Sequence, residues 1–290
     1  MDTAIIFGIN GQDGYYLEQL LVQNGLNVIG ASRKGDWLHV DVSDYEAVAA
    51  LVRQHQPAYI FHLAANSTTR HEALFENHAT IATGTLNILE AVKLFSPGTK
   101  VFLSGSGLQF VNEDKPIKET DPFAATSAYA VSRIQSVYAA RYYRSLGLKV
   151  YFGYFFNHDS PRRPERHMSN RIAAAVKRIA AGSNEQITIG DMSVRKEWAF
   201  AGDIVRGVYT LVQQDEVFEA TIGSGLAYSI EDWLGECFSQ VGKDWHNHVV
   251  QQGGFVPEYN VLVSDPSTIF SLGWRPEVSF AALAAMMLAG

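Results

Sequence analysis

Residues 3–14 read TAIIFGINGQDG. Residues 3–8 have the length and apolar character of a buried strand, and residues 14–24 have helical period. Glycines at such a strand-to-helix turn let the backbone approach a pyrophosphate, whose charge is met by the N–H groups and dipole of the helix N-terminus. The turn therefore predicts dinucleotide binding, by a set of residues consisting of Gly8, Asn10, Gly11, Gln12, Asp13 and Gly14.

The same alternation of short apolar runs and longer helical segments continues to residue 156. Parallel strands covered on both faces are apolar throughout, and such runs occupy residues 3–8, 27–31, 59–63, 100–104 and 149–155. Segments of helical period lie between them, at residues 14–24, 45–55, 77–95 and 127–146. Only residues 32–38 separate the second strand from a third at residues 39–42, which is too short for a crossover helix. The order predicts an α/β fold with a doubly wound, Rossmann-like parallel sheet.

After residue 156 the pattern changes, which predicts a smaller α/β lobe. A helix is expected at about residues 168–181, short strands near Ile187 and Thr221, and a helix that opens with a capping box at residues 229–232 and ends at Gly242. We expect residues 1–156 to form the dinucleotide-binding domain, with residues 200–225 returning to it. Residues 157–290 would then form mainly the substrate lobe, at the sheet edge where ligands bind in such folds.

The composition argues against several classes of protein. The chain has 290 residues, 47% of them hydrophobic, and a formal net charge of -7. This charge, without a basic block, argues against nucleic-acid or anionic-membrane binding, and no apolar run reaches the ~20 residues of a membrane helix. The single cysteine, Cys237, and the lack of a basic apolar leader predict a cytoplasmic protein. The histidines lack ligand spacing, so no metal is expected.

Residues at the ends of the next strands predict how a dinucleotide would lie. An acidic residue after the second strand would accept from the ribose 2'-hydroxyl of NAD, whereas the stretch Ser32-Arg33-Lys34 offers cations for a 2'-phosphate. NADP is therefore expected, with NAD as the alternative. Further contacts are expected at the adenine and ribose, from Asp41, Val42, Leu63, Ala64 and Ala65.

Two serines and a tyrosine–arginine pair are the candidate catalytic groups. Ser104 and Ser106 lie at the end of the fifth strand, and Tyr129 and Arg133 lie one turn apart on the next helix. A phenol near a permanent cation ionises more readily. Tyr129 is therefore predicted to act as general acid or base on a carbinol, while a serine hydroxyl holds the carbinol oxygen.

With the glycine turn, this arrangement resembles the extended short-chain dehydrogenase/reductases that act on nucleotide-linked sugars. The sequence is particularly similar to GDP-mannose 4,6-dehydratases, in residues 8–14, 118–123, 213–214 and 272–276, the Trp198 region, and above all the specific stretch FNHDSPRR at residues 156–163. The resemblance implies a nucleotide-sugar substrate such as a GDP-hexose. It also implies a homodimer or homotetramer joined through the helices at residues 77–95 and 127–146.

The resemblance further implies a reaction and its contacts. In that family the phenol at the Tyr129 position helps to oxidise the sugar at C4, with hydride passing to NADP. A carboxylate then removes the C5 proton, water leaves from C6, and hydride returns to C6. By the same resemblance, His158 and Arg163 are expected to contact the cofactor, Asn157 the substrate, and Arg195 a nucleotide phosphate.

The chain departs from this family at its catalytic positions. The family's catalytic Thr and Glu fall at Gly105 and Gly107, and glycine cannot transfer a proton, so the C5 base is missing unless Glu113 or Glu119 supplies it. The family's active-site Lys falls at Arg133, which can bind a ribose and a phenolate but cannot relay a proton.

A further departure concerns the substrate diphosphate. Val256 stands where the family has a diphosphate-binding Arg, and loss of a bidentate cation weakens or redirects binding there. The expected function is an NADP-dependent nucleotide-sugar enzyme, similar to GDP-mannose 4,6-dehydratase but with altered catalytic residues. The alternatives are a nucleotide-sugar 4-keto reductase or epimerase, and a catalytically silent nucleotide-binding paralogue.

Overall fold

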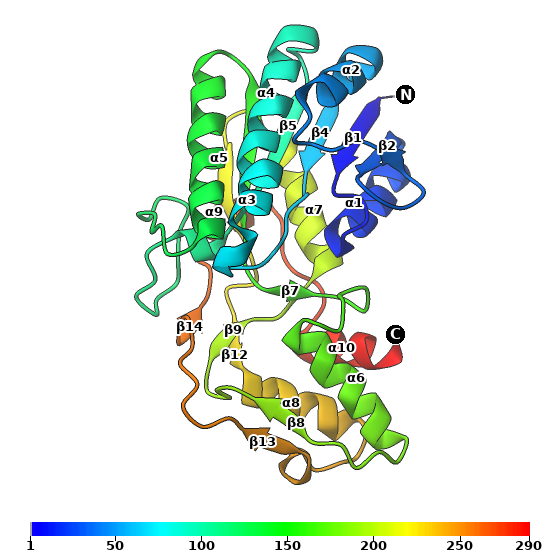
Figure 1. Ribbon diagram of the computed structural model, residues 1–290, viewed down its shortest axis with the longest axis vertical. Helices are drawn as coiled ribbons and strands as arrows, with labels where there is room; N and C mark the ends of the chain where they lie inside the picture. Colours follow the sequence, from blue (N-terminus) through cyan, green and yellow to red (C-terminus); the bar gives the residue numbers. More distant parts are fainter. Residues whose placement is uncertain (1) are drawn as a thin grey trace.

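A computed structural model describes residues 2–290, which form a large α/β domain and a smaller lobe (Figure 1). Within these residues the central sheet has seven strands in the order β11-β6-β5-β4-β1-β2-β3, each parallel to its neighbours. Their bounds are β1 (Thr3–Phe7), β2 (Asn27–Ser32), β3 (Leu38–His39), β4 (Tyr59–His62), β5 (Lys100–Ser106), β6 (Lys149–Phe155) and β11 (Glu219–Ile222). The predicted doubly wound, Rossmann-like fold is confirmed.

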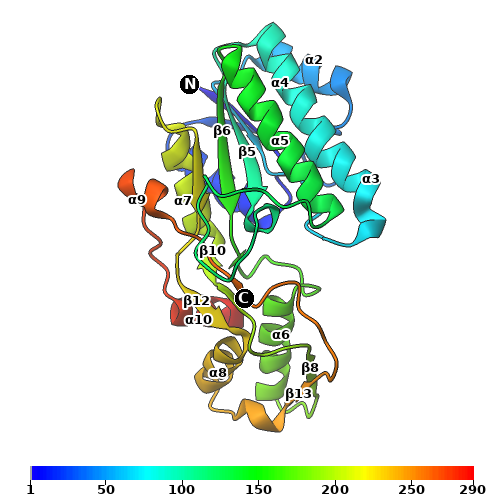
Figure 2. The same ribbon diagram turned by 90° about the vertical axis from the view of Figure 1, so that its left-hand side faces the viewer.

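Helices cover both faces of this sheet (Figure 2). One layer contains α2 (Tyr45–His55), α4 (Gly84–Phe95) and α5 (Ala128–Ser145), and the other contains α1 (Gln12–Gln23) and α7 (Ala201–Val212). Neighbouring strand residues such as Ile5 and Ile6 belong to opposite layers, because side chains alternate along a strand. Burial on both faces thus explains why the strand sequences are apolar throughout.

The helix predicted at residues 77–95 begins earlier and is not regular. The chain passes through η1 (His71–Ala73), α3 (Leu74–Asn77) and a π-helical segment, η2 (His78–Thr83), before α4 begins. A Cβ atom at Gly84 would lie 2.8 Å from Cγ1 of Val42. The absence of a side chain at Gly84 therefore lets α4 pack closely against the segment after β3.

The third strand is shorter than predicted. Asp41 and Val42 were expected to end it, but β3 stops at His39. The Asp41 carboxylate accepts hydrogen bonds from the backbone N–H and hydroxyl of Ser43, at 2.9 and 2.7 Å. These bonds turn the chain out of the sheet toward Asp44, which caps α2.

The smaller lobe has its own core. Its helices are α6 (Met168–Ala180), α8 (Ile230–Gln240), η4 (Trp245–Asn247) and α10 (Phe280–Ala289). Its strands are β8 (Ile187–Ile189), paired with β13 (Val249–Gln251), and β9 (Arg195–Glu197), which lies between β12 (Ala227–Ser229) and β14 (Val261–Leu262). The core is centred on the stacked indoles of Trp198 and Trp233, whose ring centroids are 4.5 Å apart.

A short strand pair connects the lobe to the sheet. β7 (His158–Asp159) pairs in parallel with β10 (Ala199–Phe200), directly before α7. The remaining elements are η3 (Gly107–Gln109), which follows β5, and α9 (Ser267–Ser271), which packs against β11. Within residues 2–290, none of the helices is both long and apolar enough to traverse a bilayer.

Candidate functional site

A cleft of about 780 Å³ lies at the carboxyl ends of the sheet strands. Its walls come from the ends of β1, β2, β4 and β5, from the start of α5, and from residues 155–167, which lead into the lobe. Open α/β sheets bind ligands outside the carboxyl ends of their strands. This cleft is therefore the candidate functional site.

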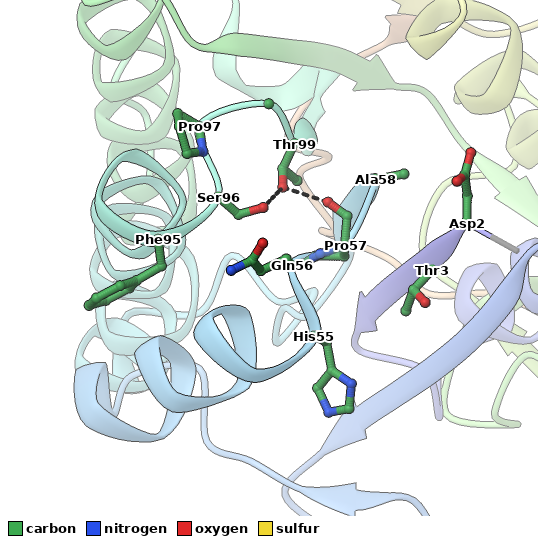
Figure 3. A pocket seen from close by; sticks show the side chains of 11 residues that line it. Asp2, Thr3, His55, Gln56, Pro57, Ala58, Phe95, Ser96, Pro97 and Thr99 are labelled. Carbon is green, nitrogen blue, oxygen red and sulfur yellow. Dashed lines mark hydrogen bonds between the residues drawn. The ribbon is translucent and has the colours of Figure 1, made fainter.

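A second hollow, of about 500 Å³, lies at the opposite end of the strands (Figure 3). It is open and is lined by the segments that precede β1, β4 and β5. The Thr99 hydroxyl donates to the carbonyl of Pro57 at 2.6 Å and lies 2.8 Å from the hydroxyl of Ser96, so it joins two turns. Because the strands present their amino ends here, the hollow is not the candidate site.

The glycine turn is shaped by close backbone approach. Gly8 has φ of 93°, and a Cβ atom there would lie 2.5 Å from the backbone nitrogen of Ala64 at the end of β4. A Cβ atom at Gly14 would lie 2.6 Å from the carbonyl oxygen of Gly8, so Gly14 lets α1 pack against the turn. Gly14 does not line the cleft, whereas the other five predicted residues of the turn do: Gly8, Asn10, Gly11, Gln12 and Asp13.

Asn10 connects this turn to the loop after β2. Its side-chain amide donates to the Ser32 hydroxyl at 2.7 Å and to the Lys34 carbonyl at 2.6 Å. Ser32, Arg33 and Lys34 consequently lie along one wall of the cleft. The other strand-end residues expected at a dinucleotide also line it, namely Asp41, Val42, Leu63, Ala64 and Ala65.

The tyrosine–arginine pair lies at the start of α5. The Ser127 side chain caps this helix by accepting from the N–H of Ala130 at 3.1 Å, and Tyr129 and Arg133 are both buried and line the cleft. The guanidinium carbon of Arg133 is 5.1 Å from the ring centroid of Tyr129. The side chains of Tyr129 and Arg133 therefore lie next to each other at the cleft.

The two serines at the end of β5 differ in their free hydrogen-bonding capacity. The Ser104 hydroxyl donates to the carbonyl of His62 at 3.0 Å and accepts from Arg133 at 3.0 Å. The Ser106 hydroxyl accepts from the N–H of Leu108 at 3.2 Å, which leaves its proton available. Ser106 is therefore the better candidate to hold a substrate oxygen.

Aromatic rings pack closely against Gly105 and Gly107. A Cβ atom at Gly105 would lie 2.4 Å from Cε1 of Phe152, and one at Gly107 would lie 2.7 Å from Cε1 of Phe156. Both rings are buried. The two glycines thus leave no empty space in which a substitute acid or base could lie.

Carboxylates are scarce at the cleft. Among the described residues that line it, the acidic ones are Asp13 and Asp41. Glu113 is exposed and pairs with a lysine, while Glu119 accepts hydrogen bonds from residues of β11 and α9. Neither Glu113 nor Glu119, the two carboxylates expected as substitutes for a base, lines the cleft.

Asp13 is engaged by His158. Its carboxylate lies 2.9 Å from Nε2 of His158, whose Nδ1 contacts the carbonyl of Phe156 at 2.7 Å. Burial alone lowers the pKa of His158, but the charge and hydrogen bond of Asp13 raise it above its ordinary value of 6.5. Burial raises the pKa of Asp13, but His158 holds it below its ordinary value of 3.8. The pair is therefore ionic, and it ties the start of α1 to the start of the lobe.

The arginine-rich loop faces the cleft and makes it electropositive. Arg162, Arg163 and Arg166 all line it, and the six lysines and arginines among the lining residues face two carboxylates. Nη1 of Arg163 donates to the His158 carbonyl at 3.1 Å. Nε of Arg133 and Oδ1 of Asn157 are buried with no hydrogen-bond partner in residues 2–290. These atoms and charges suit an anionic, polar ligand.

Arg195 does not line this cleft. It is exposed on β9, and its guanidinium donates to the carbonyl of Ala227 at 2.9 Å. The neighbouring Lys196 is partly buried, with its Nζ atom 4.4 Å from the ring centroid of Trp198, and it does not line the cleft either. Val256 lies on the loop before β14 and is 85% exposed.

Two residues that line the cleft, Ser67 and Thr69, were not predicted from the sequence. Ser67 and Thr69 belong to the polar segment that follows β4. Their position after a strand is the sequence feature from which a place at the cleft could have been predicted. The Thr69 hydroxyl donates to Glu258 of the lobe at 2.6 Å. Within residues 2–290, no group of three or more His, Cys, Asp or Glu side chains is arranged to hold a metal ion.

Comparison with protein families and curated proteins gives matches over nearly the whole chain. The family model described as GDP-mannose 4,6 dehydratase matches residues 5–287. GDP-mannose 4,6 dehydratase 1 of Arabidopsis thaliana is 30% identical over 318 residues, covering 98% of this chain and 88% of that protein.

Solved structures share the fold. RMD from Pseudomonas aeruginosa, complexed with NADPH, has a TM-score of 0.87 at 19% identity, covering 100% of this chain and 97% of that chain. The Thermus thermophilus UDP-glucose 4-epimerase complex with NAD has a TM-score of 0.84 at 21% identity, covering 99% of this chain and 98% of that chain.

Proposed function

The chain belongs to the GDP-mannose 4,6-dehydratase family, and from that premise we propose that it is an NADP(H)-dependent oxidoreductase acting on a nucleotide-linked sugar. Its reaction is the interconversion of a keto group and a carbinol on the sugar, without the 4,6-elimination of water. A GDP-hexose derivative is the proposed substrate. The family members and structural relatives are nucleotide-sugar dehydratases and epimerases, so enzymatic activity on this substrate class is the family's property.

One observation supports this proposal above the others. The cleft retains Tyr129, Arg133 and Ser106, which are the groups that a hydride transfer needs. It lacks a free carboxylate to remove the C5 proton, because Asp13 is paired with His158 and Asp41 accepts from Ser43. The rings of Phe152 and Phe156 fill the space beside Gly105 and Gly107, so no side chain enters the cleft from there. The cleft therefore contains the general acid and the serine hydroxyl that hydride transfer at the sugar requires. It contains no general base for the elimination of water.

The residues present fit a nicotinamide dinucleotide. The glycine turn brings Gly11, Gln12 and the start of α1 to the cleft, where a helix N-terminus suits a pyrophosphate. Arg33 and Lys34 supply cations for a 2'-phosphate. The structural relatives include complexes with NADPH and with NAD. When bound, such a cofactor supplies or accepts the hydride.

The remaining chemistry belongs to this chain's side chains. In the reducing direction, Tyr129 gives its hydroxyl proton to the sugar oxygen, and Ser106 donates a hydrogen bond to the same oxygen. Arg133 then stabilises the phenolate that remains, and solvent returns the proton. In the oxidising direction, the phenolate takes the proton from the carbinol.

Substrate contacts are proposed on the lobe side. The unpartnered amide oxygen of Asn157 accepts from a sugar hydroxyl, and the guanidinium groups of Arg162 and Arg166 attract the diphosphate.

Product analysis with two substrates tests the proposal. The purified protein is incubated with GDP-mannose and NADP, and separately with a GDP-linked 4-keto-6-deoxyhexose and NADPH. We expect the keto sugar to be reduced with stoichiometric loss of NADPH, and GDP-mannose to yield no 4-keto-6-deoxy product. The Tyr129→Phe variant, with cofactor affinity retained, is the control for non-enzymatic reduction.

Other outcomes would select the alternatives. Formation of a 4-keto-6-deoxy product from GDP-mannose would contradict the loss of elimination. Inversion at C4 without net NADPH consumption would indicate an epimerase. Tight binding of both ligands without turnover would indicate a catalytically silent paralogue.

A further inference from the structure

Arg33, the cation expected at a 2'-phosphate, already has an anionic partner. Its Nη2 atom lies 3.0 Å from Oε1 of Glu76, which comes from α3. The Arg33 and Glu76 side chains are 52% and 44% exposed. Arg33 lines the cleft, whereas Glu76 is not among the lining residues. The Glu76 carboxylate thus forms an ion pair with the Arg33 guanidinium at the rim of the proposed cofactor site.

The Glu76 carboxylate is held in this position by its own segment. Its Oε2 atom accepts from the side-chain amide of Asn66 at 2.8 Å. The carbonyl of Asn66 accepts from the N–H of Thr68 at 2.8 Å, and the carbonyl of Thr68 accepts from the buried amide of Asn77 at 3.1 Å. These bonds brace residues 66–77, so the carboxylate is not a freely moving surface group.

Arg33 is braced from the other side. Asn10 of the glycine turn holds both neighbours of Arg33 through the Ser32 hydroxyl and the Lys34 carbonyl. Hydrogen bonds from Arg33 and then from Asn66 hold the pKa of Glu76 below its ordinary value of 4.5, so Glu76 is ionised at neutral pH. The fold therefore fixes a negative charge beside Arg33.

We propose that Glu76 is a specificity-determining residue, which competes with the 2'-phosphate of NADP for Arg33 and so narrows the preference for NADP over NAD. This inference rests on the proposed use of a nicotinamide dinucleotide. A phosphate dianion that approaches Arg33 meets the repulsion of the Glu76 carboxylate. NAD carries a hydroxyl at the same position and experiences little of this repulsion. Glu76 thus weakens NADP binding selectively.

Binding measurements on five proteins test this competition. Dissociation constants for NADP and for NAD are measured by calorimetry on the wild-type chain, Glu76→Gln, Glu72→Gln and the double variant Arg33→Gln/Glu76→Gln, with Arg33→Gln as its reference. Glu72 is the matched control, because it is an exposed acid one turn earlier in the same segment. Glu76→Gln removes the charge and keeps the size of the side chain.

We expect Glu76→Gln to tighten NADP binding about two- to fivefold, as removal of an exposed competing ion pair implies, and to leave NAD binding unchanged within about 1.5-fold. Glu72→Gln should change neither constant, and the effect of Glu76→Gln should disappear in the Arg33→Gln background. Equal effects on both cofactors, an equal effect of Glu72→Gln, or weaker NADP binding in Glu76→Gln would overturn the inference. A wild-type chain that binds neither dinucleotide would instead refute the proposed function, and the inference with it.

Discussion

Gly105 and Gly107 are tightly packed against aromatic side chains. At Gly105 and Gly107 the neighbouring rings of Phe152 and Phe156 occupy the directions in which a side chain would begin. A side chain at either position would therefore require the neighbouring ring to move. Tyr129 and Arg133, the groups proposed for hydride transfer, come from a different element, α5.

Substitution of Gly105 by alanine tests this packing. The new Cβ atom would lie 2.4 Å from Phe152, and overpacking of a core typically costs about 1–3 kcal/mol. We expect Gly105→Ala to lower the free energy of unfolding in urea by that amount. Gly98→Ala is the control, because a Cβ atom at Gly98 would meet nothing within 4 Å; equal stability of both variants would show that the site beside Phe152 is not tightly packed.

The first turn of α1 and the short strand β7 are coupled by one ion pair. Asp13 and His158 meet at 2.9 Å, and Gln12 adds a hydrogen bond to the His158 carbonyl at 3.2 Å. This contact joins the glycine turn to the segment that leads into the lobe. It also neutralises a carboxylate that would otherwise repel a pyrophosphate at the start of the helix.

The stability that this pair contributes should depend on pH. The raised pKa of His158 means that its stabilisation is complete below its ordinary value of 6.5 and is lost as the pH rises through the higher folded value. The lowered pKa of Asp13 means that its stabilisation is complete above 3.8 and is lost as the pH falls through the lower folded value. The pair is thus fully formed between these two ordinary values.

Comparison of the wild-type chain with His158→Gln measures this dependence. We expect the variant to be less stable by about 1–3 kcal/mol at a pH of about 5.5, as for a hydrogen bond between charged groups, and the difference to shrink at a pH of about 8.5. Urea unfolding at both pH values gives the free energies. His71→Gln, which removes an exposed histidine that has no acidic partner within 4 Å among residues 2–290, should show no such change. A constant difference would mean that His158 does not carry the charge.

Long-range packing limited what the sequence could predict. The glycine turn and the strand-end residues were predictable, because parallel topology brings every carboxyl end to one edge of the sheet. Arg195 and Lys196 were not distinguishable, since adjacent residues of β9 point in opposite directions and only the folded register decides which one is enclosed. Glu76 and Glu119 have no local signal either, because their partners are distant in sequence.

The whole molecule combines a negative net charge with an electropositive cleft. The chain carries a formal charge of -7, yet six lysines and arginines line the cleft. The positive cleft therefore attracts an anionic ligand, while the remaining, negatively charged surface repels anions. A second feature is apolar exposure on the outer helix layer, where α4 and α5 present Leu86, Leu94, Val131, Tyr138 and Tyr142.

We predict that this apolar face joins two copies of the chain in a homodimer. Sedimentation velocity at micromolar concentration should give a dimer for the wild-type chain and a monomer for Tyr138→Glu/Tyr142→Glu, because buried charges oppose association. Val22→Glu on α1, also exposed but on the opposite layer, should remain dimeric. A monomeric wild-type chain, or a double variant that still dimerises, would contradict this assignment.

Transfer of deuterium from NADPH labelled at C4 of the nicotinamide to a GDP-linked 4-keto sugar tests the central claim most directly. We predict that mass spectrometry and NMR will find the label at C4 of the sugar with the wild-type chain. The rate should be about 10²- to 10⁴-fold lower in Tyr129→Phe, as for loss of a general acid, with NADPH affinity unchanged. An unlabelled sugar, or label transferred equally fast by Tyr129→Phe, would contradict a hydride-transfer site built around Tyr129.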